Sequence, residues 1–231
     1  MVFPLKGFTF DWYIEMWNKA RLHQALWNSI KVGVIASIIS TFIALFAAKA
    51  FTRYRVKYSG LSYGAILLPF IIPEIIIAVA FIVIWTSMGL KLGLIPITIS
   101  HVLYCTPFCL LILISRMDGF DKSLEEASMD LGENVFGTFW RVTFPLLLPG
   151  IIASLLLSFV ISFDEFILAF FLSSSDQTLP IYMWSQLRFP KKLPHVLALG
   201  AIIIVATSFI VMLSYWFRNI GQSKNNKGIH I

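Results

Sequence analysis

Five long apolar runs constrain the fold of this chain more than any other feature of its sequence. A helix needs about 20 residues to cross the hydrocarbon core of a bilayer. The runs cover roughly residues 29–51, 61–86, 93–115, 145–172 and 195–217. Backbone polar groups inside a bilayer must be satisfied within the chain, so each run predicts a helix. Because the connections are short, we expect an all-α integral membrane protein with five transmembrane helices in one bundle.

The composition is that of a membrane protein and excludes other classes. Hydrophobic residues make up 58% of the 231 residues and charged residues only 13%, whereas soluble domains carry about 25% charged residues. The net charge of +6 does not indicate nucleic acid, because the basic residues are spread over the ends of the apolar runs. Cys105 and Cys109 lie four residues apart in one run and do not predict a disulfide.

The longest polar interval between two apolar runs, residues 123–145, is typical of a helical elbow. Ser123 followed by Glu126 fits a capping box, which predicts a helix start. Gly132 can end that helix, and Asn134 can cap a second one before Pro145 opens the next run. So small an elbow cannot bury its apolar side chains within itself, and we expect it to dock into a partner or lie on the bilayer. Those side chains are Leu124, Ala127, Leu131, Val135, Phe136, Phe139 and Trp140.

The same interval resembles a known motif. Glu126-Ala127-Ser128, three residues, Gly132, nine residues and Val142-Thr143-Phe144-Pro145 are similar to the EAA loop of ABC-importer permeases. That family has E-A-A, G and I-x-L-P at the same spacings. Ser128, Val142 and Phe144 differ from the pattern in residue type only.

In that family the loop fits a cleft on a cytoplasmic ATPase and transmits its movement. The resemblance therefore implies that this interval couples the chain to an ATPase. The apolar residues alone would equally allow an elbow lying on the membrane surface. The coupling residues that the resemblance implies are Glu125, Glu126, Ala127, Ser128, Gly132, Val142, Phe144 and Pro145.

Three acids lie within the apolar runs. Pro69 and Pro73 predict that the second helix is kinked or broken near Glu74. Asp164 and Glu165 lie midway along the fourth run, about 100° apart if the run is one helix. One would then face a pathway and the other a neighbouring subunit. Buried carboxylates are costly in a bilayer, so a cation-attracting cavity is the functional interpretation and acids hydrogen-bonded within the fold are the structural one.

The third run carries His101, Tyr104, Cys105 and Cys109 between Pro96 and Pro107. The spacing of the histidine and cysteines allows a metal site, but no carboxylate lies beside them, and packing of small polar residues between helices is favoured. Tyr104 can line a pathway for a cation through its ring face. The tentative pathway residues are therefore Glu74, Tyr104, Asp164 and Glu165.

The basic residues favour one orientation. The side that holds the 53–60 loop, the elbow and the tail carries ten lysines and arginines, and the other side carries eight. The positive-inside rule places the first side in the cytoplasm and the N-terminus outside. Segment 1–28, which carries Trp12, Trp17 and Trp27, then lies outside or at the interface. It resembles the external segment after the first helix of the family, so we expect that this chain lacks that helix.

The other outward segment, residues 173–194, is polar, then aromatic, then basic. Ile181–Phe189 can form one short interfacial helix between Pro180 and Pro190. In an importer, a delivering binding protein would touch this surface, and an ordinary aromatic belt is the alternative. Taken together, residues 1–231 form one transmembrane domain: segment 1–28, a bundle over 29–217 that contains the coupling loop 116–144, and a polar tail over 218–231.

The chain has no P-loop, H-E-x-x-H or G-x-S-x-G motif, so it is expected to be a transport subunit and not an enzyme. Over most of its length it is similar to the spermidine/putrescine permeases, in particular their second membrane subunit. The matching residues are Asn28-Ser29, Arg53-Tyr54-Arg55, Pro73-Glu74, Arg116-Met117-Asp118-Gly119-Phe120-Asp121, the EAA loop and Ser162-Phe163-Asp164-Glu165.

This resemblance implies a bacterial inner-membrane complex. Its partners would be a second permease, a dimer of ABC ATPases and an extracytoplasmic polyamine-binding protein, with no nucleic acid. The chain itself would hold no cofactor, because ATP and Mg²⁺ belong to the ATPase. Three alternatives stay open: the same machinery for iron, thiamine or another solute, a secondary transporter, and a membrane scaffold.

Overall fold

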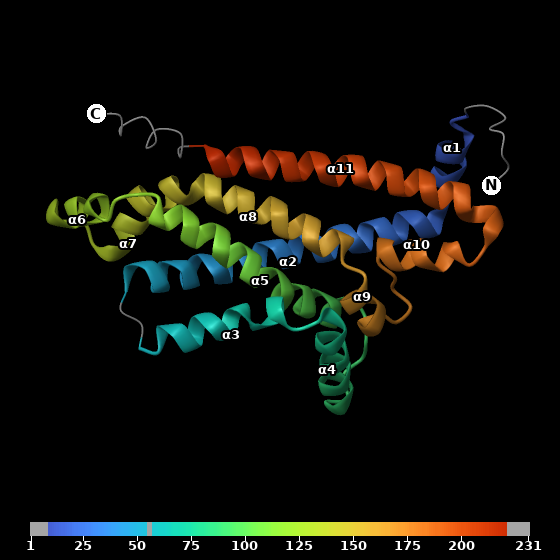
Figure 1. The fold of residues 1–231 in the computed structure, drawn as a ribbon, viewed down its shortest axis with the longest axis horizontal. Coiled ribbons are helices and arrows are strands. Elements are labelled where there is room, and N and C mark those ends of the chain that lie inside the picture. The colour runs from blue at the N-terminus through green and yellow to red at the C-terminus, as the bar shows by residue number, and fades with distance from the viewer. Residues whose placement is uncertain (1–8, 55–56, 221–231) are drawn as a thin grey trace.

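The computed structural model describes residues 9–54 and 57–220, and within these residues the only regular structure is helical. Figure 1 shows the long helices lying lengthwise beside one another. They are α2 (Ala20–Arg53), α5 (Leu94–Asp118), α8 (Phe144–Asp164) and α11 (Leu193–Asn219). The shorter helices are α1 (Asp11–Trp17), α3 (Ser59–Ile71), α4 (Glu74–Ser87), α6 (Ser123–Asp130), α7 (Val135–Thr138), α9 (Ile167–Leu172) and α10 (Leu179–Leu187).

Small side chains at four-residue spacing bring α2, α5 and α8 together. On α2 the buried stripe is Ala36, Ser40, Ala44 and Ala48. On α8 it is Ser154, Ser158 and Ser162. Residues four apart share one helix face, and small residues on that face let backbones approach closely. The bundle is therefore built by close helix contact, as expected where lipid supplies no hydrophobic drive between helices.

The two cysteines of α5 pack between helices, as the sequence predicts. Cys105 Sγ donates to the Ser158 carbonyl at 3.6 Å, and Cys109 Sγ lies 3.6 Å from Ser40 Oγ. Both side chains are buried and neither forms a disulfide. Among the described residues, no group of three or more His, Cys, Asp or Glu side chains is arranged to hold a metal ion.

The predicted break in the second span is confirmed. α3 and α4 meet at an angle of 102°, and α4 projects away from the bundle (Figure 1). Ile72 is extended, with φ −75° and ψ 133°, because the ring of Pro73 disfavours a helical residue before it. Four other helical segments are long and apolar enough to cross a membrane, and the bent pair adds a fifth if it is counted as one span.

The fourth span differs from its prediction. We expected one helix over 145–172, but α8 ends at Asp164 and α9 begins at Ile167. Glu165 is extended, with φ −69° and ψ 125°. Asp164 and Glu165 therefore do not lie 100° apart on one helix. The reason is a side-chain contact: Glu165 binds the backbone amides that begin α9, which replaces the helical continuation.

The elbow begins at Ser123 as predicted, but not through a capping box. Ser123 is the first helical residue of α6, and its amide donates to the Asp121 carboxylate at 3.0 Å. Hydrogen bonds from Ser123 lower the pKa of Asp121, which keeps this cap charged at neutral pH. Gly132 has φ +94° and Asn134 Oδ1 accepts from the Gly137 amide at 2.7 Å, so both predicted turn residues are confirmed.

The second elbow helix is not separate from the following span. α7 continues through a π-helical turn, Phe139–Thr143, directly into α8, so Pro145 lies inside a continuous helix and does not open a new one. Proline has no N–H for the i−4 carbonyl, and the wider π turn just before it accommodates that loss. The second elbow helix, α7, is therefore continuous with α8, and α6 is joined to it through the turn at Gly132.

The two ends of the bundle have different elements. The end of α2, the elbow and the end of α11 lie together, and α1 and α10 lie at the opposite end (Figure 1). His195 of α11 lies 2.9 Å from Glu15 of α1 at that opposite end. The predicted short helix is α10, which starts at Leu179 and holds Pro180 in its first turn. The polar tail lies outside the described residues, except that α11 extends to Asn219.

Candidate functional site

The centre of the elbow is a buried carboxylate. Glu125 of α6 is 8% exposed. One of its oxygens lies 2.7 Å from Arg53 Nε at the end of α2, and the other accepts the hydroxyl of Thr143 in the π turn. Three elements that are separate in sequence therefore meet on one side chain. The resemblance placed Glu125 among the coupling residues, and its contacts within the chain hold the elbow to the bundle.

Arg53 extends this junction to α5. Its Nη2 donates to the carbonyl of Met117 at 3.2 Å, and its guanidinium lies 4.6 Å from the ring centre of Phe120. A planar guanidinium can pair with a carboxylate, donate to carbonyls and stack on an aromatic ring at once. The elbow is thus joined to the ends of both α2 and α5.

A second arginine ties α5 to the ends of α8 and α11. Arg116 Nε donates to the carbonyl of Leu146 at 3.1 Å, and its Nη1 donates to that of Ile220 at 2.7 Å. The side chain passes over Gly150, where an added Cβ would lie 2.9 Å from Arg116 Cγ. Only glycine at this position leaves room for the arginine.

The outer surface of the elbow is apolar and uncovered. Leu131 is 88% exposed and Phe136 is 72% exposed, which confirms that the elbow does not bury its apolar residues within itself. Beside it lies a groove of about 420 Å³. The groove is lined by Phe46, Lys49, Ala50, Tyr54, Val135, Phe136, Phe139 and Trp140.

The predicted coupling residues differ in how far they are exposed to solvent. Glu126, Ala127, Gly132 and Pro145 are exposed. Val142 and Phe144 are half-buried in the π turn and the start of α8. Ser128 Oγ lies 3.1 Å from Thr138 Oγ1, which ties α6 to α7.

The acids of the spans lie in three different environments. Glu74, the first residue of α4, is half-buried and accepts a hydrogen bond from the Tyr104 hydroxyl of α5. Asp164 is exposed at the end of α8, and no hydrogen bond or ion pair engages it within the described residues. Of the predicted pathway residues, the structure brings Glu74 and Tyr104 together and leaves the Asp164 carboxylate available.

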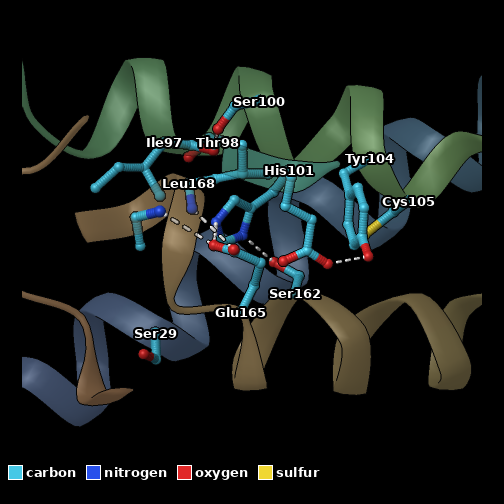
Figure 2. A network of polar contacts seen from close by, with 12 residues as sticks. Ser29, Ile97, Thr98, Ser100, His101, Tyr104, Cys105, Ser162, Glu165 and Leu168 are labelled. Carbon is cyan, nitrogen blue, oxygen red and sulfur yellow. Dashed lines mark hydrogen bonds and ion pairs between the residues drawn. The ribbon is translucent and has the colours of Figure 1, made fainter. Parts of the chain in front are cut away.

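Glu165 is instead enclosed by the fold. It is 6% exposed, and its two oxygens accept from the amides of Leu168 at 2.8 Å and Ala169 at 3.0 Å. Oε2 also lies 3.1 Å from His101 Nε2, and His101 Nδ1 lies 2.7 Å from Ser162 Oγ. Figure 2 shows the imidazole between Ser162 and Glu165. Glu165 therefore fits the structural interpretation, in which a buried acid is bound within the fold, whereas Asp164 is exposed.

Sequence reasoning missed two partners, Arg53 for Glu125 and His101 for Glu165. Both had a signal. Arg53 is the first basic residue after an apolar run, and His101 is a histidine in the interior of an apolar run. A charged group at membrane depth needs a partner of opposite charge or a hydrogen bond, but the sequence did not say which residues would meet.

Comparison with known protein families identifies the family of this chain. Residues 40–224 match the family described as binding-protein-dependent transport system inner membrane component. The chain belongs to this family. It is a permease subunit of a binding-protein-dependent importer and lies in the inner membrane.

Relatives of this permease are named as permeases of spermidine and putrescine transport systems. The spermidine/putrescine transport system permease protein PotC of Haemophilus influenzae is 31% identical over 210 residues, covering 90% of this chain and 81% of the relative. PotC of Escherichia coli K12 is 30% identical, covering 96% and 84%. The putrescine transport system permease protein PotI of the same strain is 26% identical, covering 91% and 77%.

Solved structures share the fold of this permease at low identity. A bacterial alginate ABC transporter in complex with an alginate-bound periplasmic protein matches with a TM-score of 0.69 at 15% identity, covering 90% of this chain and 81% of that one. The inward-facing MetNI methionine ABC transporter matches with a TM-score of 0.65 at 16% identity, covering 87% and 98%. The arrangement of helices is therefore that of ABC importer membrane subunits.

Proposed function

We propose that this permease imports polyamines, and that it forms half of the translocation pathway with a second permease subunit. The observation that carries the proposal is its similarity, over at least nine-tenths of the chain, to relatives named for spermidine and putrescine transport. The acids support it. Asp164 and Glu74 give the spans exposed and half-buried carboxylates without a basic partner among the described residues. Such a surface attracts cations and repels anions.

The proposed pathway residues are Asp164, Glu74 and Tyr104. Polyamines are flexible polycations, so each ammonium group needs a carboxylate or an aromatic face along the way. Asp164 offers an uncompensated carboxylate at the end of α8, and the half-buried Tyr104 lies beside Glu74. Glu165 contributes indirectly, because its oxygens are already bound within the chain.

We further propose that the elbow docks into a cytoplasmic ABC ATPase, with ATP and Mg²⁺ held there. The elbow carries more exposed apolar surface than its own folding uses, including Leu131 and Phe136. It is also joined rigidly to α2, α5 and α8 through Glu125 and Arg53. A partner that moves the elbow therefore moves the bundle. By linkage, a loaded solute-binding protein outside should stimulate ATP hydrolysis inside.

The test is reconstitution of the complete transporter. The chain is co-expressed with an ABC ATPase, a second permease and a solute-binding protein from the same organism, and uptake of labelled spermidine and putrescine is measured in proteoliposomes. We expect saturable uptake that needs both ATP and the binding protein. A complex that couples ATP hydrolysis to another solute, such as iron or thiamine, would reject the polyamine assignment and retain the importer. Uptake without any ATPase would reject both.

A further inference from the structure

Two of the predicted spans of this permease break, and a carboxylate lies at each break. Glu74 begins α4 after Pro73, and Glu165 is an extended residue between α8 and α9. The two short helices pack on each other, because Ile77 and Ala78 of α4 lie in one cluster with Leu168 of α9. The two breaks therefore belong to one structural unit, the α4–α9 unit.

One turn of α5 holds both carboxylates. His101 and Tyr104 are three residues apart and so lie on one face of α5. Tyr104 donates its hydroxyl to Glu74, and His101 Nε2 lies 3.1 Å from Glu165 Oε2. In Figure 2 both side chains extend from α5, and the imidazole of His101 lies beside Glu165. No other helix contributes a side chain to either carboxylate among the described residues.

The histidine ring is fixed from its other side. Ser162 Oγ lies 2.7 Å from His101 Nδ1. The imidazole therefore has the serine hydroxyl on one side and the Glu165 carboxylate on the other. Ser162 and Glu165 flank Asp164 on the chain, so the same imidazole contacts α8 just before its end and the extended residue just after it.

We propose that His101 is a positioning residue for transport: by holding Ser162 and Glu165 it fixes the end of α8 and thereby places the Asp164 carboxylate in the pathway. Tyr104 acts in parallel on Glu74 at the start of α4. The proposal rests on the proposed function for the role of Asp164, but the geometric part stands alone. If His101 is lost, Glu165 loses one of its three contacts and the end of α8 is no longer held on both sides.

The geometric part is tested with a thiol in place of the carboxylate. Asp164→Cys is labelled with a hydrophilic maleimide in the assembled transporter, and labelling of the native Cys105 and Cys109, both buried, is subtracted using the parent chain. Adding His101→Leu should raise the labelling rate of residue 164 by about tenfold, because the end of α8 opens more often once the contact between the imidazole and Glu165 is lost. His101→Gln, which can both donate and accept, should restore most of the parent rate.

Cys105→Ala is the matched control, because Cys105 lies one turn further on the same face of α5 and donates to Ser158 without touching either carboxylate. It should leave the labelling rate of residue 164 unchanged. Equal labelling in the parent and His101→Leu chains would overturn the proposal. If His101→Leu does not assemble, the comparison of His101→Gln with His101→Asn, which has a shorter reach, decides the same point.

Uptake kinetics then test the functional part. His101→Leu should raise the KM for spermidine more than it lowers the maximal rate, and it should add no further KM change in an Asp164→Asn background. A merely structural histidine would give independent, multiplicative effects, and that result would overturn the positioning role. A complex that moves no polyamine would overturn the proposed function, while the labelling result would still decide the geometry.

Discussion

Arg53 and Glu125 form an ion pair, with Nε and Oε2 2.7 Å apart, that joins the end of α2 to the first helix of the elbow. Both side chains are largely withdrawn from solvent, since the side chain of Arg53 is 8% exposed and that of Glu125 is 11% exposed. Thr143 donates to the same carboxylate from the π turn that continues into α8. A single buried pair therefore connects the elbow to two of the long helices, and its loss should be felt in both coupling and stability.

The first prediction concerns this pair. Arg53→Met leaves the Glu125 carboxylate buried without its cation, and breaking a buried pair from one side typically costs about 3–5 kcal/mol. We expect a lower thermal unfolding temperature of the purified transporter and less ATPase co-purifying with it. Arg53→Met combined with Glu125→Leu should regain much of the stability, since no charge is then left unpaired. A double variant as unstable as the single one would contradict this account.

The second prediction concerns Gly132, whose φ of +94° lies in a region that other residues adopt at a cost. An added Cβ would meet nothing within 4 Å, so a substitution acts only through the backbone. Gly132→Ala should destabilise the end of α6 by about 1–3 kcal/mol and lower uptake, whereas Gly132→Asn should be milder because asparagine tolerates this conformation. The check is uptake and binding-protein-stimulated ATPase activity in both variants. If both variants were as active as the parent chain, the positive φ of Gly132 would not matter for coupling.

The third prediction concerns Gly150. The Cβ of Gly150→Ala would lie 2.9 Å from Arg116 Cγ, so the arginine must move and lose its bonds to the carbonyls of Leu146 and Ile220. We expect a stability loss of about 1–3 kcal/mol, typical of overpacking. In an Arg116→Ala background the same substitution should cost little, and the measurement is the double-mutant cycle in thermal unfolding. Additive losses would mean that the clash is not with Arg116.

The fourth prediction separates the neighbouring acids. Asp164→Asn removes an exposed carboxylate and should raise the KM for spermidine while leaving thermal stability nearly unchanged. Glu165→Gln replaces one of the two oxygens that accept from the Leu168 and Ala169 amides with a group that cannot accept, and it should lower stability. Asp11→Asn, an exposed acid in α1 outside the spans, is the control for loss of charge alone. The same KM and stability changes in both span variants would argue against separate roles.

The fifth prediction concerns the exposed face of the elbow. Leu131→Ser, at a position that is 88% exposed, should keep the fold and reduce co-purification of the ATPase. The lost contact is apolar, so the effect should appear as weaker association and not as lower stability of the permease. Leu187→Ser, an exposed leucine of α10 at the opposite end, should leave co-purification unchanged. Equal ATPase recovery with Leu131→Ser would favour an elbow that only rests on the membrane.

Features with local causes were predictable. The spans follow from run length, the break before Glu74 follows from the ring of Pro73, and the elbow turn follows from Gly132 and Asn134. Each needs only the residues beside it. Two local features were not predicted. At the start of α6 the Asp121 carboxylate accepts from the Ser123 amide in place of the expected capping box. At the end of α8 the Glu165 carboxylate binds the amides that begin α9, and in both places a nearby carboxylate competes for backbone amides.

The sequence by itself thus determined the membrane class, the elbow and the family pattern, because hydropathy, turn residues and spacing are written along the chain. Only the tertiary structure decided which acid is free and which is held. Asp164 and Glu165 are neighbours with similar chemistry, yet His101 on another helix binds one and leaves the other exposed. A carboxylate at membrane depth takes its role from the partner that the fold brings to it, and that partner is distant in sequence.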